Sequence, residues 1–180
     1  MFNRKQICIL AGMELDAFKQ AQRPDPKTGL DDLLFMSPDG VDDAYGDDGR
    51  KRYARYTADD VLMLACAVQL AAGGGYISRA MSFANASKIM SNQVAMTSEV
   101  VRRTRETKRL HFVGYATMAD GGGANVSGTL SEIEERLQLT DEHEYVNFYL
   151  IAPAVVLRAI EERAAANQIE WDSAAIWKTA

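Results

Sequence analysis

The sequence predicts an α+β protein with a mainly helical N-terminal half followed by a small C-terminal α+β unit. Apolar residues recur at helical spacing through much of residues 3 to 109, whereas residues 110–118 and 145–152 have the composition of strands. Residues 130–139 and 153–167 are predicted helices, the first capped by Ser131. In the second, the apolar side chains expected to face inward are Val155, Val156, Ile160 and Ala164.

Two short helices around a glycine are predicted at the N-terminus. Asn3 is a good N-cap, and Gly12 ends the first helix in a turn. The second helix starts near Glu14 and turns Leu15 and Phe18 inward. Its polar side, left for solvent or a ligand, includes Lys19, Gln20 and Arg23. Such a pair is a helix-turn-helix candidate, although pairs of this kind are common.

Charge is unevenly distributed along the chain. Residues 1–109 hold 16 Lys and Arg against 14 Asp and Glu, whereas residues 110–180 hold 4 against 11. Seven aspartates lie between Gly29 and Gly49 with no Lys or Arg among them. This acidic loop lacks the ligand spacing of an EF-hand, so no metal site is predicted there. Without the loop, the N-terminal part carries the positive charge expected of a surface that meets phosphates.

A cationic stretch follows the acidic loop directly. It is predicted to form the returning strand of a small hairpin or wing and consists of Arg50, Lys51, Arg52, Tyr53, Ala54, Arg55 and Tyr56. Thr57 then caps an apolar helix whose first turn contains Asp59 and Asp60, where the helix dipole favours acids. A second interpretation stays open, in which the strand is solvated and its cations only balance the nearby aspartates.

This order of parts resembles the winged helix-turn-helix DNA-binding domain of MerR-type transcription regulators. The resemblance rests on residues 6–13, on the Arg-Tyr-Thr-x-x-Asp-Val junction at 55–61 and on residues 70–80. It implies that the second helix enters the major groove and that the wing grips the backbone. The implied DNA contacts are Lys19, Gln20, Arg23, Arg50, Lys51, Arg52, Tyr53 and Arg55. The acidic insertion and the absence of a cysteine cluster near the end of a long helix depart from the family, so metal sensing is not expected.

The resemblance and the composition together predict three segments. Residues 1–87 form the winged helix-turn-helix with an acidic insertion at 24–49, residues 88–109 a connecting helix, and residues 110–180 an α+β dimerisation or effector unit. A break in the helical region is expected near Thr97 and Ser98. Arg102, Arg105 and Arg109 lie about one turn apart, so that side is expected to touch DNA backbone or an acidic partner, or else to be an ordinary solvated helix end.

These features predict a cytoplasmic DNA-binding transcription regulator without cofactor or enzymatic activity. Cys8 and Cys66 have apolar surroundings typical of buried thiols, and His111 and His143 share no recognisable catalytic motif with them. The longest nearly apolar run is interrupted before the roughly 18 to 20 residues of a membrane span. The expected partners are double-stranded DNA, a second copy in a homodimer and a protein bound by the C-terminal unit. The alternative is a phage-type DNA-packaging, antitoxin-like or protein-interaction adaptor module.

Overall fold

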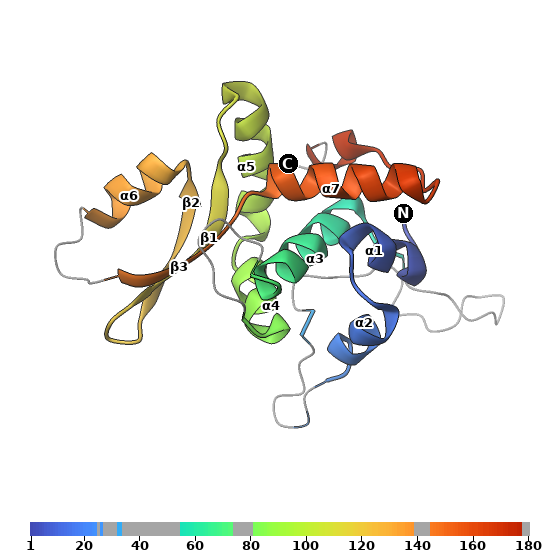
Figure 1. The fold of residues 1–180 in the computed structure, drawn as a ribbon, viewed down its shortest axis with the longest axis horizontal. Helices are drawn as coiled ribbons and strands as arrows, with labels where there is room; N and C mark the ends of the chain where they lie inside the picture. Colours follow the sequence, from blue (N-terminus) through green and yellow to red (C-terminus); the bar gives the residue numbers. More distant parts are fainter. Residues whose placement is uncertain (25, 27–31, 34–54, 74–80, 139–144, 178–180) are drawn as a thin grey trace.

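The structure, a computed structural model, describes residues 1–24, 26, 32–33, 55–73, 81–138 and 145–177. These residues form an α+β fold (Figure 1), which confirms the predicted class. The helices are α1 (Arg4–Ala11), α2 (Leu15–Ala21), α3 (Ala58–Ala71), α4 (Phe83–Ser91), α5 (Val94–Thr107), α6 (Leu130–Gln138) and α7 (Pro153–Ala166), with a 3-10 helix η1 (Ser173–Trp177). The strands are β1 (Phe112–Met118), β2 (Gly123–Gly128) and β3 (Tyr145–Ile151). Most of the predicted acidic insertion and wing, residues 34–54, lies outside the described residues.

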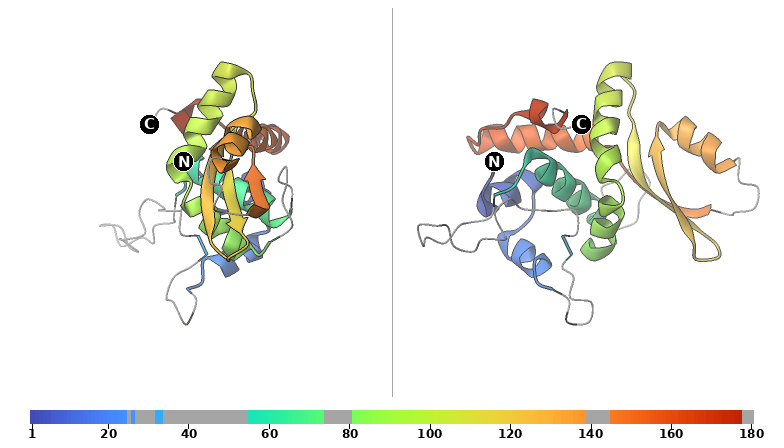
Figure 2. Two further views of the ribbon diagram at one scale, coloured as in Figure 1. Left: turned by 90° about the vertical axis from the view of Figure 1, so that its left-hand side faces the viewer. Right: turned by 180° about the vertical axis from the view of Figure 1, so that it is seen from behind.

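A three-stranded antiparallel sheet separates α6 from the other helices (Figure 2). The strand order is β2-β1-β3, and β1 pairs with both neighbours. Because side chains alternate along a strand, Phe112 and Ala116 of β1 pack with Ile133 of α6, whereas Val113 joins the larger core on the opposite face. Strands β1 and β2 form a hairpin, with Gly121 at φ 87° in its turn.

Helix α3 lies at the centre of the larger core. Thr57 and Asp60 form the capping box at its start, because Asp60 N donates to Thr57 Oγ1 at 3.1 Å and Thr57 N to Asp60 Oδ2 at 2.8 Å. The predicted cap is therefore confirmed. The sequence indicated one buried side, yet all seven residues from Val61 to Ala67 are buried. The reason is that this helix is surrounded by α1, α4, α5, α7, β3 and η1.

The break in the second helical region lies between α4 and α5, at Asn92 and Gln93, earlier than the predicted Thr97. Thr97 is inside α5, where its Oγ1 donates to Gln93 O at 2.8 Å. The Gln93 side chain is buried and its Nε2 donates to Gly114 O of β1 at 2.8 Å. This bond joins the α4–α5 corner to the central strand of the sheet.

Two details of the C-terminal helices differ from expectation. Thr129, and not Ser131, caps α6, since Thr129 N donates to Glu132 Oε2 at 2.7 Å and Glu132 N donates to Thr129 Oγ1 at 3.3 Å. In α7, Val155 is 50% exposed and Leu157 is buried in its place. The predicted inward set was therefore wrong at one position, because α7 turns residues 153, 156, 157, 160 and 164 inward.

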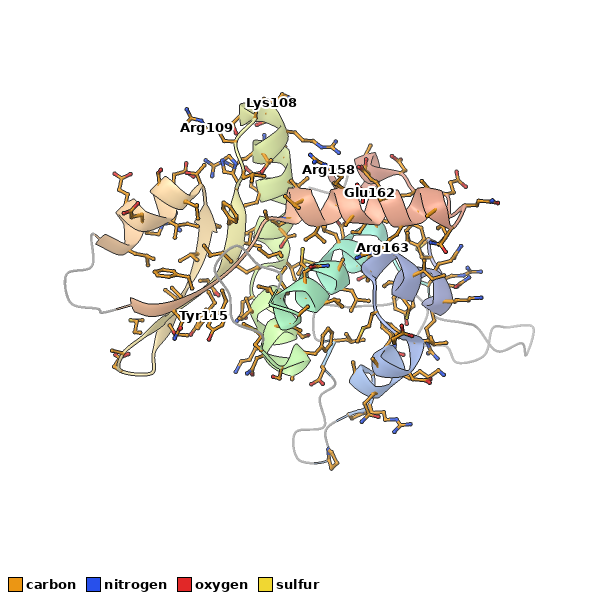
Figure 3. All side chains as sticks on the ribbon, in the orientation of Figure 1. Lys108, Arg109, Tyr115, Arg158, Glu162 and Arg163 are labelled. Carbon is orange, nitrogen blue, oxygen red and sulfur yellow. The ribbon has the colours of Figure 1, made fainter. Side chains whose placement is uncertain are left out.

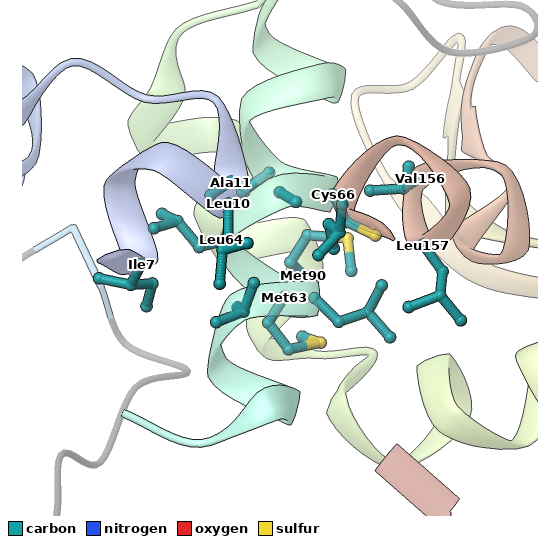
Figure 4. Packing of buried hydrophobic residues seen from close by; sticks show 14 of the residues in the cluster. Ile7, Leu10, Ala11, Met63, Leu64, Cys66, Met90, Val156 and Leu157 are labelled. Carbon is teal, nitrogen blue, oxygen red and sulfur yellow. The ribbon is translucent and has the colours of Figure 1, made fainter. Parts of the chain in front are cut away.

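The larger core takes side chains from both ends of the chain (Figure 4). Helix α7 packs against α1, α3 and α5, so Val156 and Leu157 lie in one cluster with Leu10 and Leu64. Residues on both sides of the predicted boundary at 109/110 thus contribute to one core, while the segment boundaries themselves stay predictions. Within the described ranges, no helix is long and apolar enough to cross a membrane.

Candidate nucleic-acid interface

The turn between α1 and α2 is held by a glycine in the left-handed region. Gly12 has φ 73°, and its N–H and that of Met13 donate to Ile9 O and Cys8 O at 3.2 and 2.9 Å. These bonds satisfy the last carbonyls of α1. The predicted helix end is confirmed, and α2 begins three residues later.

Arg163 of α7 fixes this turn from outside (Figure 3). Its Nη1 donates to Leu10 O at 3.0 Å, which places a cation against the C-terminal carbonyls of α1. A Cβ on Gly12 would lie 2.8 Å from the Arg163 guanidinium carbon. The position therefore requires glycine both for its backbone conformation and for the space that Arg163 fills.

Helix α2 is anchored by Tyr56, the residue just before the Thr57 cap. The Phe18 and Tyr56 rings are fully buried and meet edge to face with their centroids 5.8 Å apart. Gln22 Nε2 donates to the Tyr56 hydroxyl at 3.0 Å, and Tyr56 pairs through its backbone with Phe2. Tyr56 thus ties α2 to the chain that enters α3. Leu15, expected to face inward, is 37% exposed because Phe18 and Ala21 form the buried side.

The predicted contact residues lie on the polar face of α2 and just beyond its C-terminal end at Ala21. Lys19, Gln20 and Arg23 are all exposed. Lys19 Nζ lies 2.8 Å from Asp16 Oδ1, and this hydrogen bond lowers the pKa of the Asp16 carboxyl. Arg23 Nη1 donates to Gln20 Oε1 at 3.0 Å and makes no ion pair within the described part of the chain. Arg23, two residues beyond the end of α2, is consequently the less compensated of these two cations, and a phosphate would compete with Asp16 for Lys19.

Of the DNA contacts predicted in the wing, the structure describes only Arg55. Arg55 is exposed and precedes the buried Tyr56, whose backbone pairs with Phe2 in an isolated β-bridge. Arg50, Lys51, Arg52 and Tyr53 lie outside the described residues, and their roles stay predictions.

The second cationic cluster, at the end of α5, is largely neutralised. Arg102 lies 2.6 Å from Glu99 Oε1 and 2.5 Å from Glu106 Oε1, and its hydrogen bond lowers the pKa of the Glu99 carboxyl. Arg103 pairs with a glutamate of α6 at 2.9 Å, and Arg105 with one of α7 at 4.0 Å. Arg109 is not on the helix, which ends at Thr107. Lys108 and Arg109 follow the C-terminal end of α5, and neither makes an ion pair with a described residue (Figure 3).

The sequence did not identify the positioning roles of two residues, Tyr56, which anchors α2, and Arg163, which holds the turn before it. Tyr56 had a local signal, because an aromatic residue between Arg55 and a helix cap is typical of a strand side chain that packs inward. Arg163 had none, since 153 residues separate it from Leu10. Both thiols are buried and free, as predicted, and burial raises the pKa of Cys8 to about 11. The described residues contain no group of three or more side chains that could hold a metal.

In comparisons with known proteins, no protein-family model and no curated sequence matched this chain.

Proposed function

We propose that this protein binds double-stranded DNA through α2 and the cationic stretch 50–55, and acts as a transcription regulator. The observation that supports this function best is the two-sided character of α2. One side is fixed by Phe18 against Tyr56, and the other presents Lys19 and Gln20 to solvent, with Arg23 exposed just after the helix ends at Ala21. A helix held rigidly with cations and an amide on its open face is suited to the major groove, where Gln pairs with adenine edges and Arg with guanine edges or phosphates.

The finer description follows the resemblance to MerR-type regulators. We propose a winged helix-turn-helix in which α1 and α2 are the helical pair and the stretch 50–55 is the wing. We further propose a cytoplasmic, non-enzymatic homodimer whose C-terminal unit contacts a protein partner, because paired modules gain DNA affinity through effective concentration. Light scattering at micromolar concentration gives the mass, and a monomer mass contradicts the dimer.

One observation favours the second candidate, a packaging or adaptor module with little sequence preference. In the free protein Gln20 Oε1 accepts from Arg23, and Lys19 pairs with Asp16. These contacts would have to break before the side chains read bases. A regulator prefers its site over bulk DNA by about a thousandfold or more, whereas a packaging module shows a strong salt dependence and little preference.

The test is DNA affinity of Arg23→Ala measured by fluorescence anisotropy at several salt concentrations. We expect weaker binding and a log–log salt slope shallower by about 0.9, the value for one lost phosphate contact. The matched control is Arg136→Ala, which removes the same charge from the exposed face of α6 on the far side of the sheet. Equal effects of the two substitutions would show that only net charge matters and would refute α2 as the contact helix.

A further inference from the structure

A cleft of about 290 Å³ lies between α4 and the face of the sheet that is turned away from α6. Its walls combine aromatic, amide, hydroxyl, cationic and aliphatic groups. The lining residues of α4 and its approach are Met81, Asn85, Lys88, Ile89 and Asn92, and those of the sheet are Tyr115, Thr117 and Tyr149. The cleft is separate from α2 and from the cationic end of α5, and it shares no residue with the proposed DNA interface.

Two tyrosines form the sheet wall of the cleft. Tyr115 and Tyr149 face each other as register partners on β1 and β3, and Tyr115 lies near the lower end of the sheet in Figure 3. Both rings are partly buried and pack against the larger core. A Cβ on Gly123 would lie 2.3 Å from Cζ and from the hydroxyl of Tyr115. Glycine at the start of β2 therefore leaves the space in which the Tyr115 ring lies, and so it positions this wall.

The opposite wall is one face of α4. Asn85, Lys88 and Asn92 are spaced by three and four residues, which places them on the same side of the helix, and all three are exposed. Lys88 makes no ion pair with any described residue, and none of the described residues that line the cleft is an Asp or Glu. The cleft thus contains one uncompensated positive charge.

Thr117 supplies an unsatisfied polar group in the same place. Its Oγ1 is buried and has no hydrogen-bond partner among the described residues. Leaving a buried hydroxyl unpaired costs free energy. The hydroxyl is one of two buried side-chain polar atoms in the described part of the chain that lack a partner, and the other, Trp171 Nε1, does not line this cleft.

We propose that this cleft binds a small aromatic monocarboxylate. The Tyr115 and Tyr149 rings with Ile89 offer faces and edges against which an aromatic ring packs. Lys88 supplies a point charge for the carboxylate, and Asn85 and Asn92 supply donors and acceptors beside it. A single cation matches a single negative charge, so a carboxylate suits the site better than a dianionic phosphate. The volume is at the small end of the roughly 300–1,000 Å³ usual for ligand pockets, which favours a one-ring ligand.

The experiment uses the full chain and three probes, benzoate, 4-hydroxybenzoate and the neutral isostere benzamide, in NMR and calorimetric titrations. We expect saturable binding of both carboxylates with shifts of the Tyr115 and Tyr149 ring signals. Benzamide should bind about tenfold more weakly, the usual effect of losing one charge-assisted hydrogen bond. Lys88→Met should weaken benzoate binding by about the same factor and leave benzamide unchanged.

Controls separate the cleft from general charge and from misfolding. Lys5→Met removes an exposed lysine of α1 and should leave all three affinities unchanged. Asn85→Trp fills the cleft from an exposed helix position and should abolish binding while thermal unfolding stays close to that of the parent. The proposal is overturned if neither carboxylate binds saturably up to about 10 mM, if Lys88→Met retains the preference for benzoate, or if Asn85→Trp binds as well as the parent. None of these readouts requires DNA, so the site can fail or hold independently of the proposed function.

Discussion

Replacing Gly12 by alanine tests how α7 controls the turn that orients α2. Alanine at φ 73° should cost about 1–2 kcal/mol, because a side chain in the left-handed region meets its own backbone. Its Cβ would also lie 2.8 Å from the Arg163 guanidinium. That group ends a flexible side chain and can move away, but only by giving up its 3.0 Å hydrogen bond to Leu10 O. A hydrogen bond from a charged donor stabilises a fold by about 1.5 kcal/mol at the low end of the usual range. We use this low value because the Arg163 site is only partly buried.

The total for Gly12→Ala is therefore about 2.5–3.5 kcal/mol in the free energy of unfolding. The assay is urea unfolding of the parent, Gly12→Ala, Arg163→Ala and the double variant as a thermodynamic cycle. Without the arginine, Gly12→Ala should cost only about 1–2 kcal/mol, so the coupling between the two sites should be about 1.5 kcal/mol.

Gly12→Asn provides the control for the backbone contribution, because asparagine tolerates the left-handed region better than alanine while it still carries a Cβ. It should cost less than alanine in the Arg163→Ala background and retain the coupling in the parent. If Gly12→Ala costs the same with and without Arg163, within about 0.3 kcal/mol, the proposed contact between α7 and the turn is refuted.

Two further predictions concern the C-terminal helices. Ile160→Ala should destabilise the protein by about 2–5 kcal/mol because Ile160 is fully buried, whereas Val155→Ala on the exposed side of α7 should stay within about 0.5 kcal/mol; equal losses in urea unfolding would contradict the observed orientation of α7. Hydrogen bonds from Thr129 N and Arg103 lower the pKa of Glu132 below its usual 4.5. The ionised Glu132 carboxylate therefore stabilises the fold above pH 4.5, and this stabilisation is lost as the pH falls through the lowered pKa. Glu132→Gln should therefore lower the free energy of unfolding by about 0.5 kcal/mol at pH 7, a small value because the carboxyl is well exposed. This difference from the parent should shrink below about pH 4. A difference in stability that does not depend on pH would show that the charge of Glu132 does not contribute.

Features that depend on neighbours in sequence were the predictable ones. The Thr57 cap, the Gly12 helix end and the exposure of Lys19, Gln20 and Arg23 each follow from a few adjacent residues. The Asp16–Lys19 pair also had a local signal, because acids and cations three residues apart meet on a helix. The resemblance instead implies a DNA contact at Lys19.

Features that depend on tertiary packing were not predictable from periodicity. The all-round burial of α3 arises from the helices and the strand that surround it, whereas its sequence is compatible with one buried face. Val155 and Leu157 are both aliphatic, so only contact with α1 and α3 decides which of them turns inward. Lys88 and Tyr149 likewise line the same cleft between α4 and the sheet only because the chain folds, since they are far apart in the sequence.

The packing of α7 on α1 also sets an order for biosynthesis. A ribosome releases residues 1–73 long before Ile160 and Ile176, which complete the cluster that begins with Phe2 and Ile7, and before Arg163, which donates to Leu10 O. During translation α1 and α2 are therefore synthesised before the α7 and η1 residues that pack against this core, and contacts so distant in sequence are slow to form. Messages cut short before codon 163 would yield nascent chains in which the α1–α2 corner is left unbraced.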